Sequence, residues 1–352
     1  MQALCKTSLA PGAMEIRSLP VPEPGAGEVR IRVAAGGVCG TDMHIYHGAP
    51  EIARLLKPPL VLGHEISGVV DAVGAGVTRV AGGERVSLES HIPCGACYPC
   101  RLGRTHICRQ TGYPGVTRDG GFAEYVVVPE RIVWVHPQHI DLHTAALFEP
   151  FGIAVHACLE GCGVAGMNVL VTGCGPIGLM SITVAKAYGA HTIIATDVNP
   201  TRLALATQMG ATRVVDVRHE DPLAVVRDLT HGDGVDVALE FAGQPSALAQ
   251  AVEALTPGGD LRLVGAAEGP VPVDITRWIL KGLRVQGIHG RKLFSSWEHA
   301  GRLVYEGRVD LRPLISHRLP LDQGVRAFAL IEQGEAIKVL LVPENRGGQY
   351  AF

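Results

Sequence analysis

The sequence lacks the surplus of positive charge by which many proteins bind DNA or RNA. It has 31 Lys and Arg residues against 34 Asp and Glu residues, which gives a formal net charge of −3. Proteins that hold a phosphate backbone by neutralising it usually carry a clear basic excess. We therefore do not expect a nucleic acid as a partner.

Long hydrophobic runs are also absent. The first six residues contain no apolar run of the signal-peptide type. The longest apolar stretches, such as 126–128 and 193–196, fall far short of the roughly 20 residues that a membrane helix needs. The sequence predicts a soluble, cytoplasmic protein that does not act at a membrane.

Charged residues are few, and no internal repeat or low-complexity segment is visible. Charged residues make up 18% of the chain and hydrophobic residues 47%, which suits globular cores and is too little charge for a disordered chain. At roughly 150 residues per domain, the 352 residues predict about two domains.

The two parts of the chain differ in the secondary structure that their sequence pattern predicts. Up to about residue 150, β-like runs such as 28–33 and 68–73 alternate with Gly and Pro turn signals, which predicts a mostly antiparallel β domain. Beyond it, strands alternate with helices, which predicts a parallel sheet with right-handed crossovers. The fold class is therefore α/β with an added β-rich domain. The expected strands are 169–172, 192–196, 235–240, 261–264 and 338–342, and the expected helices are 179–188 and 202–209.

A glycine-rich segment, GCGPIG at 173–178, matches the pattern G-x-G-x-x-G. With 44 glycines in the chain the pattern alone is weak, but here it follows a predicted strand and opens a predicted helix. Gly173 allows a tight turn, Gly175 lets the backbone approach a pyrophosphate, and Gly178 allows close packing of helix and strand. The helix N-terminus offers free N–H groups to the phosphates. The alternative is a glycine-rich turn without a ligand.

A carboxylate follows at the distance expected for a dinucleotide site. Asp197 lies 19 residues after Gly178, at the end of the next predicted strand, where it can accept hydrogen bonds from the adenosine ribose. Because this carboxylate would repel a 2′-phosphate, the sequence favours NAD over NADP. Arg202 is close enough to complicate that preference, and it could instead lie along the adenine.

Four of the nine cysteines form a tight cluster. With no export signal, such clusters indicate a metal rather than disulfides. Four thiolates within 15 residues can surround one tetrahedral zinc ion and leave no open position, which predicts a structural site. Iron–sulfur clusters use similar runs, but the last spacing here is longer than in bacterial ferredoxins. The four ligands are Cys94, Cys97, Cys100 and Cys108.

A second set of possible metal ligands lies upstream of this cluster. Cys39 begins the segment CGTDMH, and His64 and Glu65 follow Gly63. A thiolate, an imidazole and a carboxylate suit an open zinc site. Nothing in their spacing shows that they converge, and a Gly-His-Glu segment is more often a turn with an ordinary histidine.

These segments together resemble the zinc-containing medium-chain dehydrogenase/reductase family, and within it the branch that oxidises L-threonine. The resemblance extends over most of the chain. It rests on the segments CGTDMHIY (39–46), GHE (63–65), ESHIPCG (89–95), GRTHIC (103–108), FEPFG (148–152) and GIHGR (287–291).

The resemblance implies a fold and a cofactor that the periodicity does not give. It implies a GroES-like catalytic domain at 1–150, completed by 292–352, and a Rossmann NAD-binding domain at 151–291, with the active site in the cleft between them. It also implies NAD, two zinc ions per subunit and a homotetramer. The NAD contacts that it implies are Ile177, Asp197, Arg202, Val264, Gly265, Ala266, Ile288 and His289.

The resemblance also assigns the reacting groups. Cys39, His64 and Glu65 would bind the catalytic zinc, and Glu149 would lie beside it, exchanging with Glu65 or assisting the proton relay. Thr41 and His44 match the relay pair of the family. The substrate contacts would include His91, at a position linked to substrate choice, and Arg291, whose guanidinium can bind a carboxylate bidentately.

One departure bears on the substrate. Ile153 stands where close relatives usually carry Asn, so a polar amide near the metal and the nicotinamide is lost. The expected reaction is NAD-linked oxidation of a small secondary alcohol, L-threonine to 2-amino-3-oxobutanoate. A polyol, an amino alcohol or a larger hydroxy amino acid remains open as the substrate. Two non-enzymatic alternatives are a zinc-ribbon interaction module and a cofactor-binding scaffold without catalysis.

Overall fold

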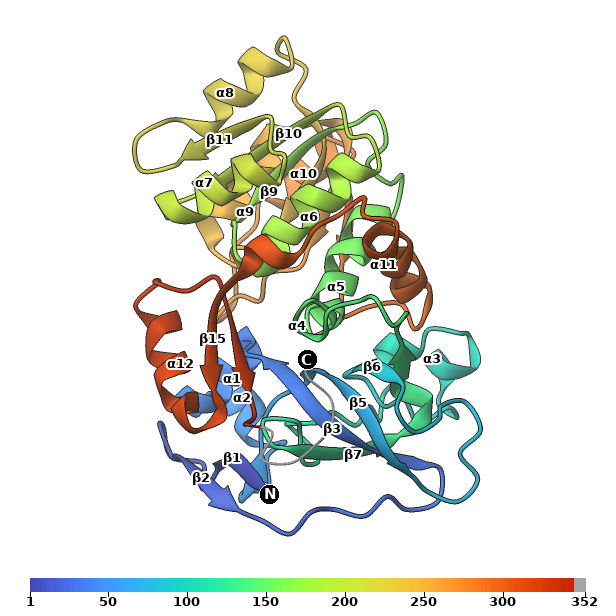
Figure 1. The fold of residues 1–352 in the computed structure, drawn as a ribbon. Helices are drawn as coiled ribbons and strands as arrows, with labels where there is room; N and C mark the ends of the chain where they lie inside the picture. Colours follow the sequence, from blue (N-terminus) through green and yellow to red (C-terminus); the bar gives the residue numbers. More distant parts are fainter. Residues whose placement is uncertain (345–352) are drawn as a thin grey trace. The chain divides into compact units, whose positions relative to one another are not determined.

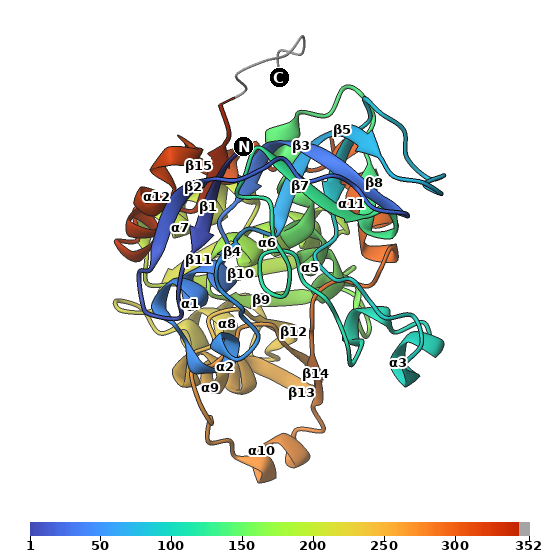
Figure 2. The same cartoon turned by 90° about the horizontal axis from the view of Figure 1, so that it is seen from below.

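The computed structural model describes residues 1–344 and divides the chain into two compact units (Figures 1 and 2). The first unit consists of Met1–Glu149 and the chain from Leu314 onward, and the second is Pro150–Pro313. The first unit is therefore assembled from two separate stretches. Residues 292–313, which the sequence analysis assigned to the catalytic domain, pack with the second unit.

The first unit is built on a seven-stranded sheet in the order β15-β16-β3-β5-β6-β8, with β7 pairing with β3. All pairs are antiparallel except β15 with β16. A small sheet has the order β2-β1-β4. The strands are β1 (Gln2–Lys6), β2 (Met14–Ser18), β3 (Glu28–Gly37), β4 (Leu60–Val61), β5 (Glu65–Val73), β6 (Arg85–Leu88), β7 (Tyr125–Pro129), β8 (Val133–Val135), β15 (Ile315–Pro320) and β16 (Lys338–Val342).

The helices of the first unit are short and lie at the ends of strands. Apolar side chains of the sheet form its core, for example Val29, Ile31 and Val33 of β3, which are fully buried. Along the first half of β3, branched apolar residues alternate with charged ones, the pattern of a strand in the β-rich domain that the sequence predicts. The helices are α1 (Gly40–His47), α2 (Pro50–Ala53), α3 (Tyr98–Arg101), α4 (Leu142–Ala145) and α12 (Gly324–Glu332), with 3-10 turns η1 (Thr105–Ile107), η2 (Glu130–Ile132), η3 (Arg312–Leu314) and η4 (Leu321–Gln323).

The second unit is a six-stranded parallel sheet in the order β11-β10-β9-β12-β13-β14, with helices between the strands. Its central strands are rich in buried apolar residues, as expected when both faces of a parallel sheet are covered. The strands are β9 (Asn168–Thr172), β10 (Thr192–Asp197), β11 (Arg213–Asp216), β12 (Val235–Glu240), β13 (Leu255–Leu263) and β14 (Arg284–Gly287).

Proline marks the first turn of four helices in this unit. Because its φ angle suits the first helical position and its missing N–H has no partner there anyway, Pro176, Pro200, Pro222 and Pro245 each begin a helix. The predicted α/β class is confirmed. The helices are α5 (Phe148–Leu159), which begins at the end of the first unit, α6 (Pro176–Ala187), α7 (Pro200–Met209), α8 (Pro222–Leu229), α9 (Pro245–Ala254), α10 (Ile275–Leu280) and α11 (Ser295–Tyr305).

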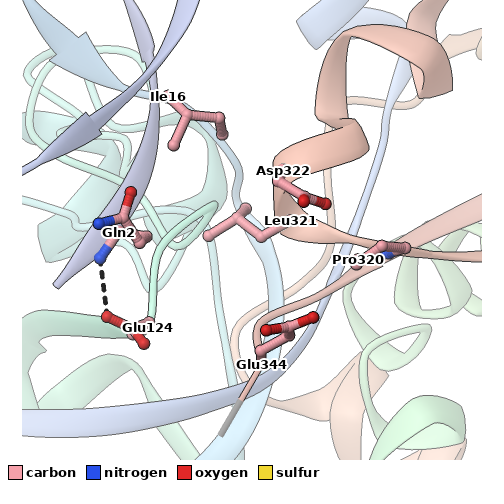
Figure 3. A pocket seen from close by; sticks show the side chains of 7 residues that line it. All are labelled: Gln2, Ile16, Glu124, Pro320, Leu321, Asp322 and Glu344. Carbon is pink, nitrogen blue, oxygen red and sulfur yellow. Dashed lines mark hydrogen bonds between the residues drawn. The ribbon is translucent and has the colours of Figure 1, made fainter. Parts of the chain in front are cut away.

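Two further features concern the described residues as a whole. Within 1–344, no helix combines the length and the apolarity needed to cross a membrane. A small pocket of about 120 Å³ lies in the first unit near β1, β2 and η4 (Figure 3). None of the expected site residues lines it; its lining is Gln2, Ile16, Glu124, Pro320, Leu321, Asp322 and Glu344.

Candidate active site

Three side chains of the first unit meet in a possible metal site. The ligand atoms of Cys39, His64 and Glu65 all lie within 4.8 Å of one another. His64 and Glu65 are buried, and Cys39 is half-buried. The convergence that the sequence spacing could not show is therefore present, and a thiolate, an imidazole and a carboxylate form a donor set that suits an open zinc site.

Local backbone geometry explains why glycines flank these ligands. Gly63 has a φ angle of +93°, and a Cβ there would lie 2.3 Å from the Phe122 ring. On β3, a Cβ at Gly37 would lie 2.1 Å from Oε2 of Glu65, its partner in the ladder between β3 and β5. Only glycine fits at either position, so the sheet brings its two strands together with room for the Glu65 carboxylate.

A buried carboxylate next to the cluster supports the assignment of a metal. Asp42 accepts the Cys39 backbone N–H through Oδ2 at 2.9 Å, and its Oδ1 lies 3.8 Å from Nδ1 of His64. Both Asp42 Oδ1 and His64 Nδ1 are buried without a hydrogen-bond partner among the described residues. A histidine that binds a metal through one ring nitrogen commonly turns the other toward a carboxylate, so these residues fit a zinc ion.

Lys338 is a residue at this site that the sequence analysis missed. Its Nζ donates to both oxygens of Glu65 at 2.8 Å and to the Val38 carbonyl at 3.0 Å, and it is buried. Burial disfavours the ammonium charge, but Glu65 and Cys39 hold the pKa of Lys338 above its ordinary value. The only signal in the sequence is a lysine at the start of an otherwise apolar strand.

The other expected reacting groups of the first unit lie around the cluster. Glu149 is 3% exposed, and its charge acts on both His64 and Lys338. Thr41 and His44 stand three residues apart on α1, with Thr41 half-buried and 4.0 Å from the Cys39 sulfur and His44 exposed. The pair therefore extends from the cluster toward solvent.

His91 is held in place by a neighbouring carboxylate. Glu89, which is fully buried, accepts from the His91 ring Nδ1 at 2.9 Å and from its backbone N–H at 2.8 Å. The ring of Tyr113 meets the imidazole edge-on. β6, which precedes Glu89, pairs with β5 in a register that sets Ser87 against Ser67, two residues after Glu65.

The four-cysteine cluster has the dimensions of a closed zinc site. The sulfurs of Cys94, Cys97, Cys100 and Cys108 lie within 4.8 Å of one another. The Cys97 sulfur is 3.5 Å from that of Cys100 and 3.7 Å from that of Cys108, far longer than a disulfide and near the roughly 3.8 Å edge of a tetrahedron with 2.3 Å bonds. Backbone N–H groups donate to Cys94 and Cys108 at 3.3–3.4 Å. The predicted structural zinc site is thus confirmed.

The second unit carries a pocket of about 340 Å³ beside the glycine-rich turn. Gly173 has a φ angle of +89°, and a Cβ at Gly178 would lie 2.0 Å from the Gly173 carbonyl, so the helix packs tightly on the strand. Asp197 accepts from the backbone N–H of Cys174 at 2.6 Å and from Val198 and Asn199 at 2.8 Å. The pocket lining includes Gly173, Gly175, Thr196, Asp197, Arg202, Phe241, Gln244 and Gln250.

Glu240 is a second residue that the sequence analysis missed. It is buried at the end of β12, and its Oε1 accepts from the backbone N–H of Ala242 at 2.8 Å and of Gly243 at 2.9 Å. It thereby shapes the turn after its strand as Asp197 does after β10. An acidic residue ending an apolar strand is the signal that both share.

The remaining expected contacts of the second unit differ in exposure. Ile288 and Arg291 are buried, whereas His289 is exposed. Ile177, Val264 and Gly265 are half-buried near the ends of their strands or helices, and Ala266 is exposed. A Cβ on Gly152 of α5 would lie 2.7 Å from Cδ of Arg291, so the arginine side chain packs against this helix.

Three features together define a zinc-dependent alcohol dehydrogenase. They are the three-residue metal cluster of the β-rich unit, its four-cysteine zinc lobe at 94–108, and a parallel sheet with a nucleotide pocket. The chain belongs to the zinc-binding medium-chain dehydrogenase family. Residues 25–138 match the model of the alcohol dehydrogenase GroES-like domain, and residues 176–306 match that of the zinc-binding dehydrogenases. The predicted family, fold class and enzymatic function are confirmed, so the zinc-ribbon interaction module and the silent scaffold are not supported.

The similarity to other proteins covers almost the whole chain. L-threonine 3-dehydrogenase of Bacillus subtilis is 45% identical over 97% of this chain and 99% of its own. An alcohol dehydrogenase of Escherichia coli, solved with NADH, is 32% identical with a TM-score of 0.89 over 97% and 99% of the two chains. A zinc-binding dehydrogenase of Sinorhizobium meliloti, solved with NADP, is 32% identical with a TM-score of 0.90 over the same shares.

Proposed function

We propose that this zinc-dependent dehydrogenase is an NAD-linked L-threonine 3-dehydrogenase, which oxidises the 3-hydroxyl of L-threonine to give 2-amino-3-oxobutanoate. The observation that carries the proposal is the convergence of Cys39, His64 and Glu65 in a chain 45% identical, over nearly its full length, to a threonine dehydrogenase. Catalysis is assigned to residues 1–150 with 292–352, and cofactor binding to 151–291. The metal cluster lies in the first of these parts and the nucleotide pocket in the second, which supports the division, although residues 292–313 pack with the unit that holds the pocket.

The residues of the first unit would hold the metal and remove a proton. When bound, zinc lowers the pKa of the substrate hydroxyl and NAD accepts the hydride. Cys39, His64 and Glu65 would hold the metal, with Glu149 beside them. Thr41 would take the hydroxyl proton and pass it toward His44, because the first is half-buried at the cluster and the second is exposed to solvent.

The residues of the second unit would select the cofactor and orient the substrate. Asp197 ends β10 in the nucleotide pocket, where a carboxylate favours the ribose hydroxyls of NAD and repels the extra phosphate of NADP. Ile177, Arg202, Val264, Gly265, Ala266, Ile288 and His289 are the other proposed NAD contacts. Arg291 would bind the threonine carboxylate, and His91 would contribute to substrate choice.

Two further assignments accompany the function. A homotetramer is supported by an apolar surface on the second unit, where Ile279 and Leu280 of α10 are 71% and 82% exposed beside the edge strand β14. A cytoplasmic location is supported by the nine cysteines, all in the described part of the chain, none of which forms a disulfide.

A substrate panel tests the proposal directly. The zinc-loaded enzyme is assayed with L-threonine, sorbitol and 2,3-butanediol, with NAD or NADP, by following the formation of the reduced cofactor. We expect threonine with NAD to give the highest kcat/KM. If sorbitol or butanediol exceeds threonine by a large factor, the proposed substrate is wrong, and a preference for NADP would contradict the role given to Asp197.

Two variants test the substrate contacts separately. Arg291→Ala removes the guanidinium and is expected to raise the KM for threonine, and His91→Ala is expected to change the order of preferred substrates. An unchanged threonine KM in the first variant, or an unchanged substrate order in the second, would contradict the corresponding role.

A further inference from the structure

One face of α5 holds the segment that carries Arg291. Gly152, His156 and Glu160 follow one another at four-residue spacing, so they lie in one row along the helix and its last turn. Each of the three meets one residue of the segment 290–292. This segment leads from β14 into α11, and α5 and α11 lie side by side in the second unit (Figure 1).

The first step of the row is a close approach of the Arg291 side chain to the backbone of α5 at Gly152. A Cβ added to Gly152 would lie 2.7 Å from Cδ and 2.8 Å from Cγ of Arg291. Glycine in the middle of a helix costs roughly 1 kcal/mol relative to alanine. Here the absence of a side chain at Gly152 makes room for the aliphatic part of Arg291, which is buried and 1% exposed.

The second step is a hydrogen bond from a buried ring. His156 is 5% exposed, and its Nδ1 lies 2.9 Å from the Gly290 carbonyl oxygen. Because the Gly290 carbonyl only accepts, this bond forms when Nδ1 carries a hydrogen. The Glu160 carboxylate beside Nε2 also only accepts, so both bonds form together when both ring nitrogens carry a hydrogen. The bond fixes the peptide plane immediately before Arg291, and with it the direction in which the arginine leaves the backbone.

The third step holds the ring and the far end of the segment together. Glu160 lies 3.1 Å from Nε2 of His156 and forms an ion pair with Lys292. Burial disfavours its charge, but Lys292, Gln286 and His156 lower the pKa of Glu160 to about 2. The carboxylate is therefore charged at neutral pH and connects the helix to Lys292 on one side and to the imidazole on the other.

We propose that His156 is a positioning residue of the reaction: through its bond to Gly290 it aims the Arg291 guanidinium at the substrate carboxylate. The inference rests on the proposed function, because it deepens the role given there to Arg291. It requires no contact of His156 with substrate, cofactor or metal. What it predicts is a loss of carboxylate recognition when the bond to Gly290 is lost and the rest of the helix is unchanged.

Two amide variants separate the two hydrogen bonds of the His156 ring. In His156→Asn the amide nitrogen can take the place of Nδ1 and still donate to Gly290, whereas in His156→Gln the longer side chain reaches the place of Nε2 and keeps only Glu160. We expect the Gln variant to raise the KM for threonine about ten-fold, the effect of one lost hydrogen bond, with kcat within about three-fold. The Asn variant should stay near wild type. Equal KM values for the two would overturn the proposal.

A double-mutant cycle tests whether the effect passes through Arg291. If it does, adding His156→Gln to Arg291→Ala should change the threonine KM by less than about two-fold, since the guanidinium is already absent. The KM for 2,3-butanediol, which has no carboxylate, should be unchanged by His156→Gln. Additive effects, or an equal effect on butanediol, would show a general structural role instead and overturn the proposal.

Another histidine provides the control, because it lines with His156 a pocket of about 190 Å³ between α5 and α11. His299 of α11 also lines it, but its ring Nδ1 pairs with the hydroxyl of Tyr188 at 2.8 Å. His299→Asn should therefore leave the threonine KM unchanged. A rise as large as that of His156→Gln would mean that the pocket as a whole matters, and would contradict the specific role.

Hydrogen exchange provides a measurement that does not depend on the substrate. In the zinc-loaded protein, the amides of 288–292 should exchange about ten-fold faster in His156→Gln than in His156→Asn. If wild type fails to oxidise threonine, the proposed function is wrong, and this comparison still decides whether His156 holds the segment. Equal exchange in the two variants would overturn the inference even in an enzyme that is active on threonine.

Discussion

At the scale of single residues, the pair formed by Lys338 and Glu65 determines the charge balance at the candidate metal site of Cys39, His64 and Glu65. Both side chains are buried, and the ammonium group bonds both carboxylate oxygens at 2.8 Å. Removing one partner of a buried ion pair typically costs about 3–5 kcal/mol, because the other charge is left without compensation. A metal ion bound at Cys39 and His64 would supply a second positive charge to the same carboxylate.

This charge balance predicts how zinc changes the unfolding free energy of the variant Lys338→Met. We expect the metal-free variant to lose about 3 kcal/mol of unfolding free energy, and zinc to restore part of the loss because the cation replaces the ammonium group. Urea unfolding with and without zinc measures both quantities. In the control Lys281→Met, which removes an ammonium group that bonds three backbone carbonyls of the second unit, zinc should stabilise as in wild type. The same zinc response in both variants would refute the prediction.

His136 makes the stability of the first unit depend on pH. The ring is buried and bonds Ser87, whose hydroxyl donates to the Ala145 carbonyl, so Nε2 donates to the Ser87 oxygen. Burial, together with the charge of Arg85, lowers the pKa of His136 from 6.5 to about 3. In the unfolded chain the ring takes up a proton near pH 6.5, so between these two values the unfolded state binds more protons than the folded state.

The stabilisation is therefore complete above pH 6.5 and decreases as the pH falls toward about 3. We expect His136→Gln to lose less stability than wild type when the pH is lowered from about 7 to about 4.5. Urea unfolding at the two values gives the difference, and comparing the two proteins cancels effects that they share, such as loss of zinc. Parallel losses in the two would show that His136 does not cause the dependence.

At the scale of elements, the zinc lobe (residues 94–108) has almost no hydrophobic core of its own. Its helix α3 and its turn η1 have four and three residues, and its apolar side chains Tyr98, Leu102 and Ile107 are 56%, 51% and 41% exposed. So few buried contacts cannot order a segment of this length. The four thiolates bound to one ion replace the missing core.

Removal of this zinc should loosen the lobe and leave the parallel sheet ordered. We expect Cys100→Ser, or a chelator that strips the ion, to increase amide exchange in 94–108 by more than about ten-fold, an opening cost of about 1.4 kcal/mol. Exchange in β9 and β12 should remain as in wild type. Exchange-mass spectrometry follows both regions in one experiment, and an equally protected lobe without zinc would contradict the prediction.

The elements also show what the sequence could predict. The glycine-rich turn and the four cysteines are local: all their groups lie within a few turns of chain, so spacing alone specifies them. β16 was predicted at its observed bounds because a short apolar run is visible without knowledge of its neighbours. The expected helices at 179–188 and 202–209 correspond to α6 and α7, whose starts lie earlier because proline occupies the first turn.

The pairing of distant strands could not be predicted in the same way. Cys39 and His64 meet because β3 pairs with β5, and Lys338 meets Glu65 across 273 positions of sequence. The spacing of these residues in the sequence does not indicate the register in which the strands pair. His156 and Glu240 were missed for another reason, since both act on backbone groups, and a hydrogen bond to a carbonyl or an N–H group leaves no motif in the sequence.

At the scale of the whole molecule, α10 exposes apolar side chains and the strand that follows it, β14, forms an open edge of the parallel sheet. All four residues of β14 are exposed at the edge of the parallel sheet, and Ile275, Ile279 and Leu280 of α10 are more than half exposed. An open edge strand beside apolar side chains is the kind of surface that associates with another copy.

Introducing charge on this surface should therefore reduce the size of the proposed homotetramer. We expect Leu280→Asp, alone or with Ile279→Asp, to convert the oligomer to smaller species at low micromolar concentration, because a carboxylate buried without a partner opposes association. Sedimentation velocity measures the change. Leu9→Asp, at an exposed apolar residue of the first unit, is the matched control. A variant that sediments like wild type would place the interface elsewhere.

The return of the chain to its first unit has a consequence for how the protein is made. β16 supplies both a strand next to β3 and the lysine that neutralises Glu65, yet it is synthesised after every strand of the parallel sheet. During translation, the sheet of the second unit can therefore close while the carboxylate of Glu65 still awaits its counter-ion. The ribosome must deliver almost the entire polypeptide before the metal centre acquires its final electrostatic environment.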